Sequence, residues 1–334
     1  MINISELSDA VTQWSLSGYW TSASADHFNE EQAPCGNAAV SLLMGNNLVK
    51  KHVQDFLALA QKYHLGTSLV DVFAESGVKC ALFLHDHFDA EFSGAVKFYD
   101  WDIDGLHVGS LPDPRTSGLI LLDMDATCVQ CECIDEMAKL AGIGDQVSAV
   151  TAMAMKGHMD FQESFRKRIA LFAGKPESVM DTVEANLPVM PGFSEMVRKA
   201  KSCGWHIAIA SGGFTRFVTK LKREYDLDYV TANDIEAVDG VFTGKVLGRI
   251  VDSSVKAQTL LMLKEQFHLD TRNTMAVGDG ANDLPMISLA GTGVAIHAKP
   301  VVREKAPVAI SNLNLQAIAV ILEAGLRLQS RLKA

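Results

Sequence analysis

The sequence lacks any apolar run long enough to cross a membrane. Although 48% of its 334 residues are hydrophobic, no segment approaches the ~18–20 consecutive apolar residues that a bilayer-spanning helix requires. The opening residues, Met1 to Glu6, contain neither the basic segment nor the apolar core of a signal peptide. We therefore expect a globular protein of the cytoplasm that has no membrane partner.

Positive charge is also scarce. The chain carries 30 Lys and Arg against 40 Asp and Glu, which gives a formal net charge of −10. This balance argues against a nucleic-acid-binding surface, because such a surface needs clustered positive charge. It also means that an anionic substrate must be attracted locally, by a few cations or a metal ion, against the field of the whole protein.

Cysteine is rare as well. There are six cysteines, of which Cys128, Cys131 and Cys133 cluster while the others are isolated in the sequence. A structural zinc site usually has a fourth ligand and a second pair of cysteines, and the sequence shows neither. We therefore expect reduced and partly buried thiols.

The length of the chain favours two domains, because a single hydrophobic core rarely serves more than about 250–300 residues. Two prolines within Leu111–Arg115 disfavour regular structure and mark a linker there. We predict one unit at residues 1–112 and a second at 116–334.

Residues 1–112 contain no recognisable chemical constellation. Apolar periodicity predicts a helix over 47–63, and a short strand is predicted at 78–84. These elements suggest a small α/β domain that is regulatory or mediates self-association, an arrangement that a homodimer would suit. His85 and His87 occupy alternate positions and could bind a metal ion, but solvated histidines at a strand end are the simpler interpretation.

The most informative stretch follows the linker. Four large aliphatic residues, Leu119–Leu122, predict a buried parallel strand, and Asp123 and Asp125 come directly after it. Open α/β sheets bind ligands at the carboxyl ends of their strands, and two acids this close repel each other unless a cation or a shared proton compensates. Alternatively, the two acids merely end the strand and cap the next helix.

Later segments place further polar groups after, or beside, apolar strands. These groups are Ser211 and Gly212 after a strand at 206–210, Asp279 and Asn282 after a strand at 274–277, and Lys256 ahead of an apolar helix. With strands at 293–296 and 308–310, the pattern predicts a sheet of about five or six strands.

The chemistry of these groups is consistent. Three carboxylates, those of Asp123, Asp125 and Asp279, without a histidine cluster suit a hard divalent cation, with Mg²⁺ preferred. Lys256, the Ser211 hydroxyl and backbone N–H groups at glycine would supply donors for an anion beside that cation. Together they describe a phosphoryl-transfer site in which a carboxylate can act as the nucleophile.

One cation stands out in a predicted helix over residues 160–173. Arg168 comes seven residues after Phe161 and therefore lies on the apolar face of that helix. An arginine in this position needs an anionic partner or a route to water. A structural salt bridge would satisfy it as well as a substrate would.

Taken in order, these segments resemble the four motifs of the haloacid dehalogenase (HAD) phosphatase superfamily. They are Asp123–Thr127, Ser211–Gly213, Lys256 and Gly278–Asp283. The similarity covers about residues 117–320. It implies an α/β fold with a HAD-like Rossmannoid parallel sheet core and a helical cap inserted at about 129–190, beside the small N-terminal α/β domain. Glu132 and Arg168 are similar to residues of the phosphoserine phosphatases within that superfamily.

The resemblance implies Mg²⁺-dependent hydrolysis of O-phospho-L-serine, the last step of L-serine synthesis. Asp123 would be the nucleophile and Asp125 the general acid and base. The Asp123 side chain, the Asp125 backbone carbonyl and Asp279 would hold the metal ion. Six residues would bind the substrate: Glu132 its ammonium, Arg168 its carboxylate, and Ser211, Gly212, Lys256 and Asn282 its phosphoryl group.

Two further readings stay open. A related enzyme could act on another small phosphomonoester or transfer the phosphoryl group from phosphoserine to homoserine. A regulatory protein with a vestigial phosphatase domain belongs to another class, and the intact acids and Lys256 argue against it. Ala126 stands where the superfamily often has serine or glycine, which bears on the fine positioning of the loop but not on its two acids.

Overall fold

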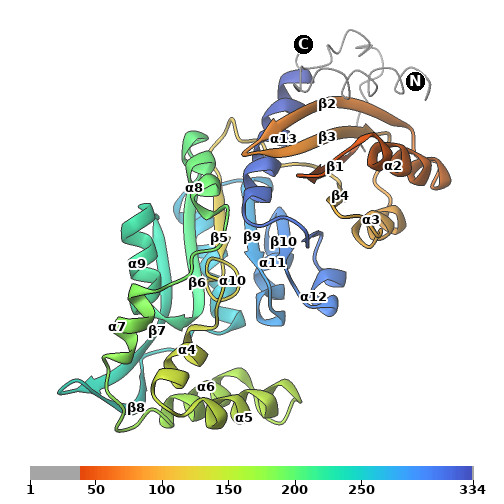
Figure 1. The fold of residues 1–334 in the computed structure, drawn as a ribbon. Coiled ribbons are helices and arrows are strands. Elements are labelled where there is room, and N and C mark those ends of the chain that lie inside the picture. The colour runs from red at the N-terminus through yellow and green to blue at the C-terminus, as the bar shows by residue number, and fades with distance from the viewer. Residues whose placement is uncertain (1–37, 333–334) are drawn as a thin grey trace.

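The computed structural model describes residues 38–332, which form two β-sheets and the helices that cover them (Figure 1). Residues 1–37 of the proposed N-terminal unit, including Cys35 and the opening segment, lie outside the described residues. Within the described part of the chain, no helix is both long enough and apolar enough to span a bilayer.

The N-terminal sheet has four antiparallel strands in the order β2-β3-β1-β4. Helices α2 and α3 cover one face of it and bury a cluster that contains Phe56, Phe83 and Phe92. The predicted helix and strand at 47–63 and 78–84 correspond to α2 and β3. The elements are β1 (Ala39–Gly45), α2 (Lys50–Lys62), β2 (Thr67–Glu75), β3 (Val78–His85), α3 (Ala90–Lys97) and β4 (Asp104–Val108).

The C-terminal sheet has seven strands in the order β11-β10-β9-β5-β6-β7-β8, and only the last pair is antiparallel. The prediction of five or six strands was therefore too low. The additional strand, β8, folds back from a turn at Asp239 and Gly240, both of which have positive φ as a tight hairpin requires. The strands are β5 (Leu119–Leu122), β6 (His206–Phe214), β7 (Tyr229–Val238), β8 (Val241–Leu247), β9 (Thr274–Gly278), β10 (Thr292–Ile296) and β11 (Val308–Ile310).

Helices cover both faces of this sheet, so its central strand is buried throughout. Ile120 and Leu122 of β5 join the core on one side, whereas Leu119 and Leu121 join a second core on the other. The alternation follows from the period of two in a strand. One face carries α8 (Phe193–Ser202), α9 (Thr215–Tyr225) and α13 (Gln316–Arg331), and the other carries α10 (Ser253–Gln266), α11 (Leu284–Leu289) and α12 (Pro300–Lys305).

The C-terminal helix α13 connects the two sheets. Its residues Ile318 and Ile321 belong to a continuous core cluster that also contains Leu42 of β1 and Ile120 of β5. The linker runs along the same helix, and Arg115 donates to the Gln329 side chain at 2.8 Å. The boundaries 1–112 and 116–334 stay proposals, because the two sheets are separate while their apolar core is shared.

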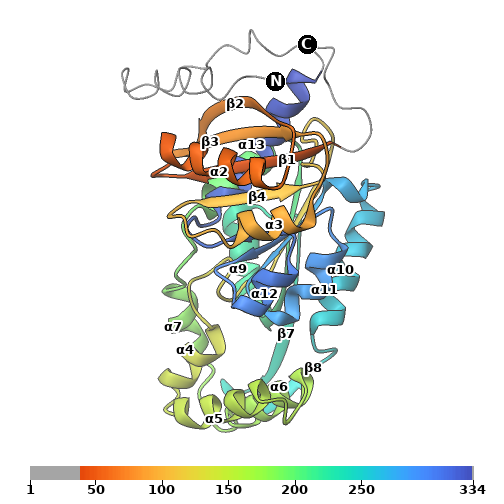
Figure 2. The same cartoon turned by 90° about the vertical axis from the view of Figure 1, so that its right-hand side faces the viewer.

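Four helices form a layer at the end of the C-terminal sheet that lies away from the N-terminal sheet (Figures 1 and 2). The segments that lead into and out of this layer run side by side, since Gln130 N–H donates to the Pro188 carbonyl and Met190 N–H to the Cys128 carbonyl, both at 2.8 Å. We refer to residues 129–190 as the cap. Its helices are α4 (Cys133–Leu140), α5 (Gly144–Met155), α6 (Phe161–Ala170) and α7 (Val179–Ala185).

The interpretation of His85 as a solvated residue was wrong. His85 is 1% exposed, because α3 covers the end of β3. Its Nε2 lies 2.8 Å from the Ser41 hydroxyl, which lies 2.9 Å from Nδ1 of His107. Burial lowers the pKa of His85 to about 3 and that of His107 to about 4. His87 does lie half-exposed beside Asp86.

This histidine pair should make the protein acid-labile. Both pKa values are depressed in the folded state, so the unfolded chain binds more protons as the pH falls below about 6.5, and stability is lost toward pH 4 and 3. At pH 5 each histidine should cost roughly 2 kcal/mol of unfolding free energy. Urea denaturation at several pH values measures this slope, and His85→Gln should flatten it. An unchanged slope in that variant would contradict the assignment.

Candidate active site

Asp123 is fixed at the carboxyl end of β5. Its N–H donates to the Val277 carbonyl of β9 at 2.9 Å, and its Oδ1 accepts from Met124 N–H at 2.7 Å. The chain then turns sharply: Ala126 has a φ of 53°, a left-handed conformation that strains a residue with a Cβ. This turn follows directly after Asp123, whose carboxylate therefore stays at the edge of the sheet.

Lys256 reaches the same point from the first turn of α10. Its Nζ lies 2.6 Å from Oδ2 of Asp123 and 2.7 Å from Oδ1 of Asp283, and all three side chains are buried. Burial alone would lower the pKa of Lys256, but the two carboxylates raise it. The lysine is therefore a permanent cation that joins β5 to the segment after β9.

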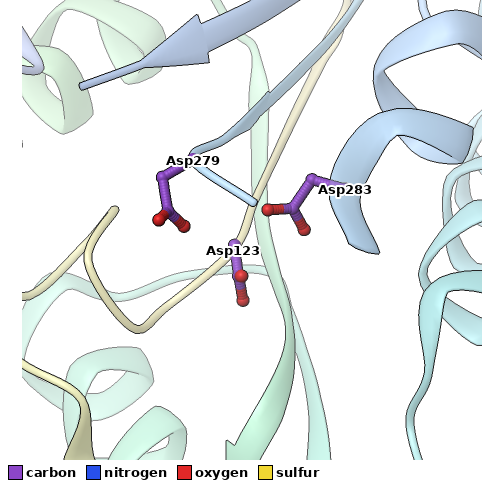
Figure 3. Close-up of side chains that lie close together, drawn as sticks. All are labelled: Asp123, Asp279 and Asp283. Carbon is purple, nitrogen blue, oxygen red and sulfur yellow. The ribbon is translucent and has the colours of Figure 1, made fainter. Parts of the chain in front are cut away.

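Three acids converge at this edge of the sheet (Figure 3). Ligand atoms of Asp123, Asp279 and Asp283 all lie within 4.8 Å of one another. Burial and then the charge of Asp283 raise the pKa of Asp123, and the same two causes raise the pKa of Asp279 to about 6.

The crowding of these acids fits a divalent metal ion. When all three carboxylates are ionised, Lys256 balances one of their charges and leaves two uncompensated. Carboxylate oxygens are the donors that hard divalent cations prefer. The three side chains could hold such an ion, and its charge would equal the excess.

Asp125 lies close by, but its carboxyl group is held toward the start of α4. Its Oδ1 accepts from Cys133 N–H at 3.1 Å, so the start of α4 orients the carboxyl group. Burial raises the pKa of Asp125, which favours the protonated form that a general acid needs. Its side chain is not part of the three-acid group described above.

The turn at the end of β6 faces Asp125. Gly213 N–H donates to the Ser211 hydroxyl at 2.9 Å. A Cβ at position 213 would lie 2.7 Å from Oδ2 of Asp125, so only glycine allows this close approach. Ser211 itself is fully buried, and the turn brings its hydroxyl and the Gly212 backbone to the edge that carries the acids.

The cap contributes the remaining predicted residues. Arg168 is half-buried above the Phe165 ring, with its guanidinium carbon 5.8 Å from the ring centroid. Its Nε has no hydrogen-bond partner among the described residues. Burial lowers the pKa of Arg168, while Asp135, Glu132 and Asp125 raise it. A cation held among acids with an unpaired donor is suited to bind a carboxylate.

Glu132 is the N-cap residue of α4 and lies among other acids. Removal from bulk water, followed by the charges of Asp125 and Asp279, raises its pKa to about 7. An incoming ammonium group would relieve this repulsion. Asn282, half-buried in the turn after β9, stands one residue before Asp283.

The cap lies against the sheet in this structure. A Cβ at Gly212 would lie 2.9 Å from Cζ of Phe161, and Gln162 donates to Oδ2 of Asp252 at 2.7 Å. Both contacts join the start of α6 to the segments that carry Ser211 and Lys256. The cap can therefore cover the acids and exclude water from them.

The structure adds one acid that sequence reasoning did not assign. Asp283 was quoted only as the last residue of Gly278–Asp283, yet it pairs with Lys256 and belongs to the three-acid group. Its spacing of four residues after Asp279 was a usable signal. The arrangement as a whole, a buried carboxylate beside a lysine, further acids and anion donors, can transfer a phosphoryl group to and from a carboxylate.

Comparison with known proteins places this geometry in a family. The model of the haloacid dehalogenase-like hydrolase family matches residues 120–288. The chain is 46% identical over 231 residues to the phosphoserine phosphatase of Vibrio cholerae, an overlap of 69% of this chain and 70% of that protein. It is 44% identical over 238 residues to the phosphoserine phosphatase of Haemophilus influenzae, which covers 71% of this chain and 76% of that protein.

Solved structures agree with these relatives. The unliganded crystal structure of a probable phosphoserine phosphatase from Vibrio cholerae superposes with a TM-score of 0.76 at 38% identity and covers 91% of both chains. A substrate-bound phosphoserine phosphatase complex covers 61% of this chain and 97% of its own, with a TM-score of 0.58 and 35% identity. This chain therefore belongs to the haloacid dehalogenase-like hydrolases and, within them, to the phosphoserine phosphatase family.

Proposed function

We propose that this protein hydrolyses O-phospho-L-serine to L-serine and inorganic phosphate through an aspartyl-phosphate on Asp123, as the last step of L-serine synthesis in the cytoplasm. The observation that carries this proposal is the half-buried Arg168 of the cap, whose Nε has no hydrogen-bond partner within residues 38–332. A phosphatase for simple phosphomonoesters has no need of that cation, whereas an amino-acid substrate supplies a carboxylate for it.

The first half of the reaction uses the buried pair Asp123 and Lys256. A carboxylate oxygen of Asp123 attacks phosphorus, a bond forms between them, and the bond from phosphorus to the serine oxygen breaks. Asp125, whose raised pKa favours a protonated carboxyl, gives its proton to the departing oxygen. Lys256 stabilises negative charge on the transferring group from its position 2.6 Å from Asp123.

The second half returns Asp123 to its starting state. Asp125, now ionised and still held by Cys133 N–H, takes a proton from the water that attacks phosphorus. The bond between phosphorus and the Asp123 oxygen breaks and phosphate leaves. The Ser211 hydroxyl and backbone N–H at Gly212 donate to phosphoryl oxygens, and Asn282 orients the group.

We infer that the metal ion is Mg²⁺, because the donors available are carboxylate and carbonyl oxygens. Asp123, Asp279 and the backbone carbonyl of Asp125 would hold it, and Asp283 borders the same space. When bound, it supplies positive charge that lets one anion approach another.

Recognition of serine falls to the cap. We propose that Arg168 binds the substrate carboxylate and that Glu132 binds its ammonium group. Phe161, packed against Gly212, closes the space between the amino-acid end and the phosphoryl end. The role of the N-terminal sheet and the oligomeric state, a homodimer being one candidate, do not enter this mechanism.

The decisive test is release of inorganic phosphate from O-phospho-L-serine. The unmodified protein should turn over with Mg²⁺ and stop with EDTA, because the acids then repel the substrate. Asp123→Asn should lower kcat on the order of 10³-fold or more while the protein stays folded by circular dichroism. Full turnover by that variant would refute the nucleophile assignment.

Substrate selection can be tested on one helix. Arg168→Ala should lower kcat/KM for phosphoserine on the order of 10²–10³-fold, because the substrate carboxylate would enter the site without its cationic partner. Hydrolysis of p-nitrophenyl phosphate, which has no carboxylate near the ester, should change much less. Arg166→Ala is the matched control, since Arg166 lies exposed two residues earlier on the same helix. Equal losses on both substrates would count against the carboxylate role.

The charge of Glu132 should appear in the pH profile. Its pKa is raised to about 7, so as the pH falls through 7 it gains a proton and can no longer pair with the ammonium group. The value of kcat/KM for phosphoserine should then fall by up to about tenfold per pH unit. In Glu132→Gln this acidic fall should be absent and activity uniformly low. The control Glu136→Gln, which changes a half-exposed acid paired with Lys139 on the same helix, should keep it. An acidic fall that persists in Glu132→Gln would exclude this role.

A further inference from the structure

A buried asparagine joins the two segments that we propose to bind the phosphoryl group. Asn233 lies on β7 and is 1% exposed. Its Nδ2 donates to the Gly212 carbonyl at 2.8 Å, and its Oδ1 accepts from Val251 N–H at 2.7 Å. Gly212 belongs to the turn at the end of β6, and Val251 directly precedes Asp252, the N-cap of α10. One side chain therefore bridges two loops that are distant in sequence.

The strand pairing explains why a side chain is needed here. β6 pairs with β7 at Ala210↔Thr231 and again at Phe214↔Asn233. Three residues on β6 therefore face one residue on β7, and the backbone from Ser211 to Gly213 bulges out of the ladder. The bulge leaves the Gly212 carbonyl without a partner in the ladder, and the side-chain amide of Asn233 donates a hydrogen bond to it. A buried backbone carbonyl requires such a partner.

The same bond orients the Ser211 hydroxyl. The carbonyl of Gly212 and the N–H of Gly213 belong to one peptide group, which Asn233 holds at its oxygen. At its nitrogen, that group donates to Oγ of Ser211 at 2.9 Å. Because the Ser211 oxygen already accepts a hydrogen bond, its own proton remains available as a donor to a phosphoryl oxygen.

The other end of the amide acts on Lys256. By accepting from Val251 N–H, Asn233 fixes the chain just ahead of α10. Oδ1 of Asp252 then accepts from Ser254 N–H at 2.9 Å and from Val255 N–H at 3.0 Å, which starts the helix. Lys256 follows in the first turn and reaches Asp123. A shift of Val251 would therefore move the lysine.

We propose that Asn233 is a positioning residue. It fixes the distance between the Ser211–Gly213 turn and Lys256, so that both can bind the same phosphoryl group. The inference rests on the proposed function, because it assigns these two segments to the phosphoryl group. Among the residues that the structure describes, the Asn233 side chain makes no hydrogen bond to Asp123 or to the cap. It therefore acts through the two backbone groups that it holds.

The test compares two buried asparagines. Asn233→Ala should lower kcat roughly 10–100-fold, with a smaller change in KM, and equally for phosphoserine and p-nitrophenyl phosphate, because the phosphoryl end is common to both. Inhibition by vanadate, a mimic of the transferring group, should weaken in parallel.

Asn273→Ala is the matched control. Asn273 is also buried and bridges by both ends of its amide, from Asp113 N–H to Thr116 and Ser117. It stands just ahead of β9, at the opposite end of the sheet from the acids. The Asn273→Ala variant should have a lower melting temperature but nearly the same kcat, once activity is normalised to the amount of folded protein.

A second variant keeps the shape of the side chain. Asn233→Asp retains an oxygen for Val251 N–H but places a carboxylate against the Gly212 carbonyl. Its kcat, relative to that of the unmodified protein, should rise toward acidic pH, because a protonated carboxyl regains the donor. A role in packing alone would give no such recovery.

Three results would overturn the proposal. The first is an unchanged kcat in folded Asn233→Ala. The second is a loss confined to phosphoserine, which would place the effect at the amino-acid end. The third is failure of both Asn233 variants to fold while Asn273→Ala does fold. Absence of phosphatase activity in the unmodified protein would instead refute the proposed function, which the same assay reports separately.

Discussion

Concentrated negative charge at the edge of the C-terminal sheet is the constraint to which the rest of the site responds. Three carboxylates converge within 4.8 Å, and one buried lysine pairs with two of them. Like charges in a low-dielectric environment are costly unless each has a partner. The lysine and a divalent cation together would supply that balance, and the same positive charge makes an anionic phosphoryl group an acceptable ligand in a protein of net charge −10.

The sheet allows this concentration because its strands bring distant segments to one edge. β5 lies between β9 and β6, so the residues at the carboxyl ends of these three strands meet there. Each of these strands is buried on both faces, so the polar residues of the segment can reach solvent or ligand only at its carboxyl end. Apolar packing therefore fixes the backbone of the site, while ion pairs and hydrogen bonds orient the side chains at the edge.

The cap and the loops are held to that edge by a few specific bonds. Gln162 links α6 to the N-cap of α10, and Asn233 links Gly212, near the end of β6, to the same segment. As a result, the cap, proposed to bind the amino-acid end of the substrate, and the Ser211–Gly213 turn, proposed to bind its phosphoryl end, are both hydrogen-bonded to the segment of Val251 and Asp252. The N-terminal sheet stands at the other end of the molecule (Figure 2). It meets the catalytic unit through α13 and through Asp104, which accepts from the N–H groups of Ser311 and Leu313.

What the sequence determined by itself were the features that local pattern controls. Four consecutive aliphatic residues make β5, Asp160 caps α6 by accepting from Glu163 N–H at 2.7 Å, and Asp239 and Gly240 make the turn ahead of β8. Ordered motifs at strand ends also indicated the family. Only the tertiary structure decided the pairing of Asp283 with Lys256, the burial of His85 and the bridge made by Asn233. These depend on contacts between residues far apart in the chain, for which an acid, a histidine or an asparagine alone carries no local signal.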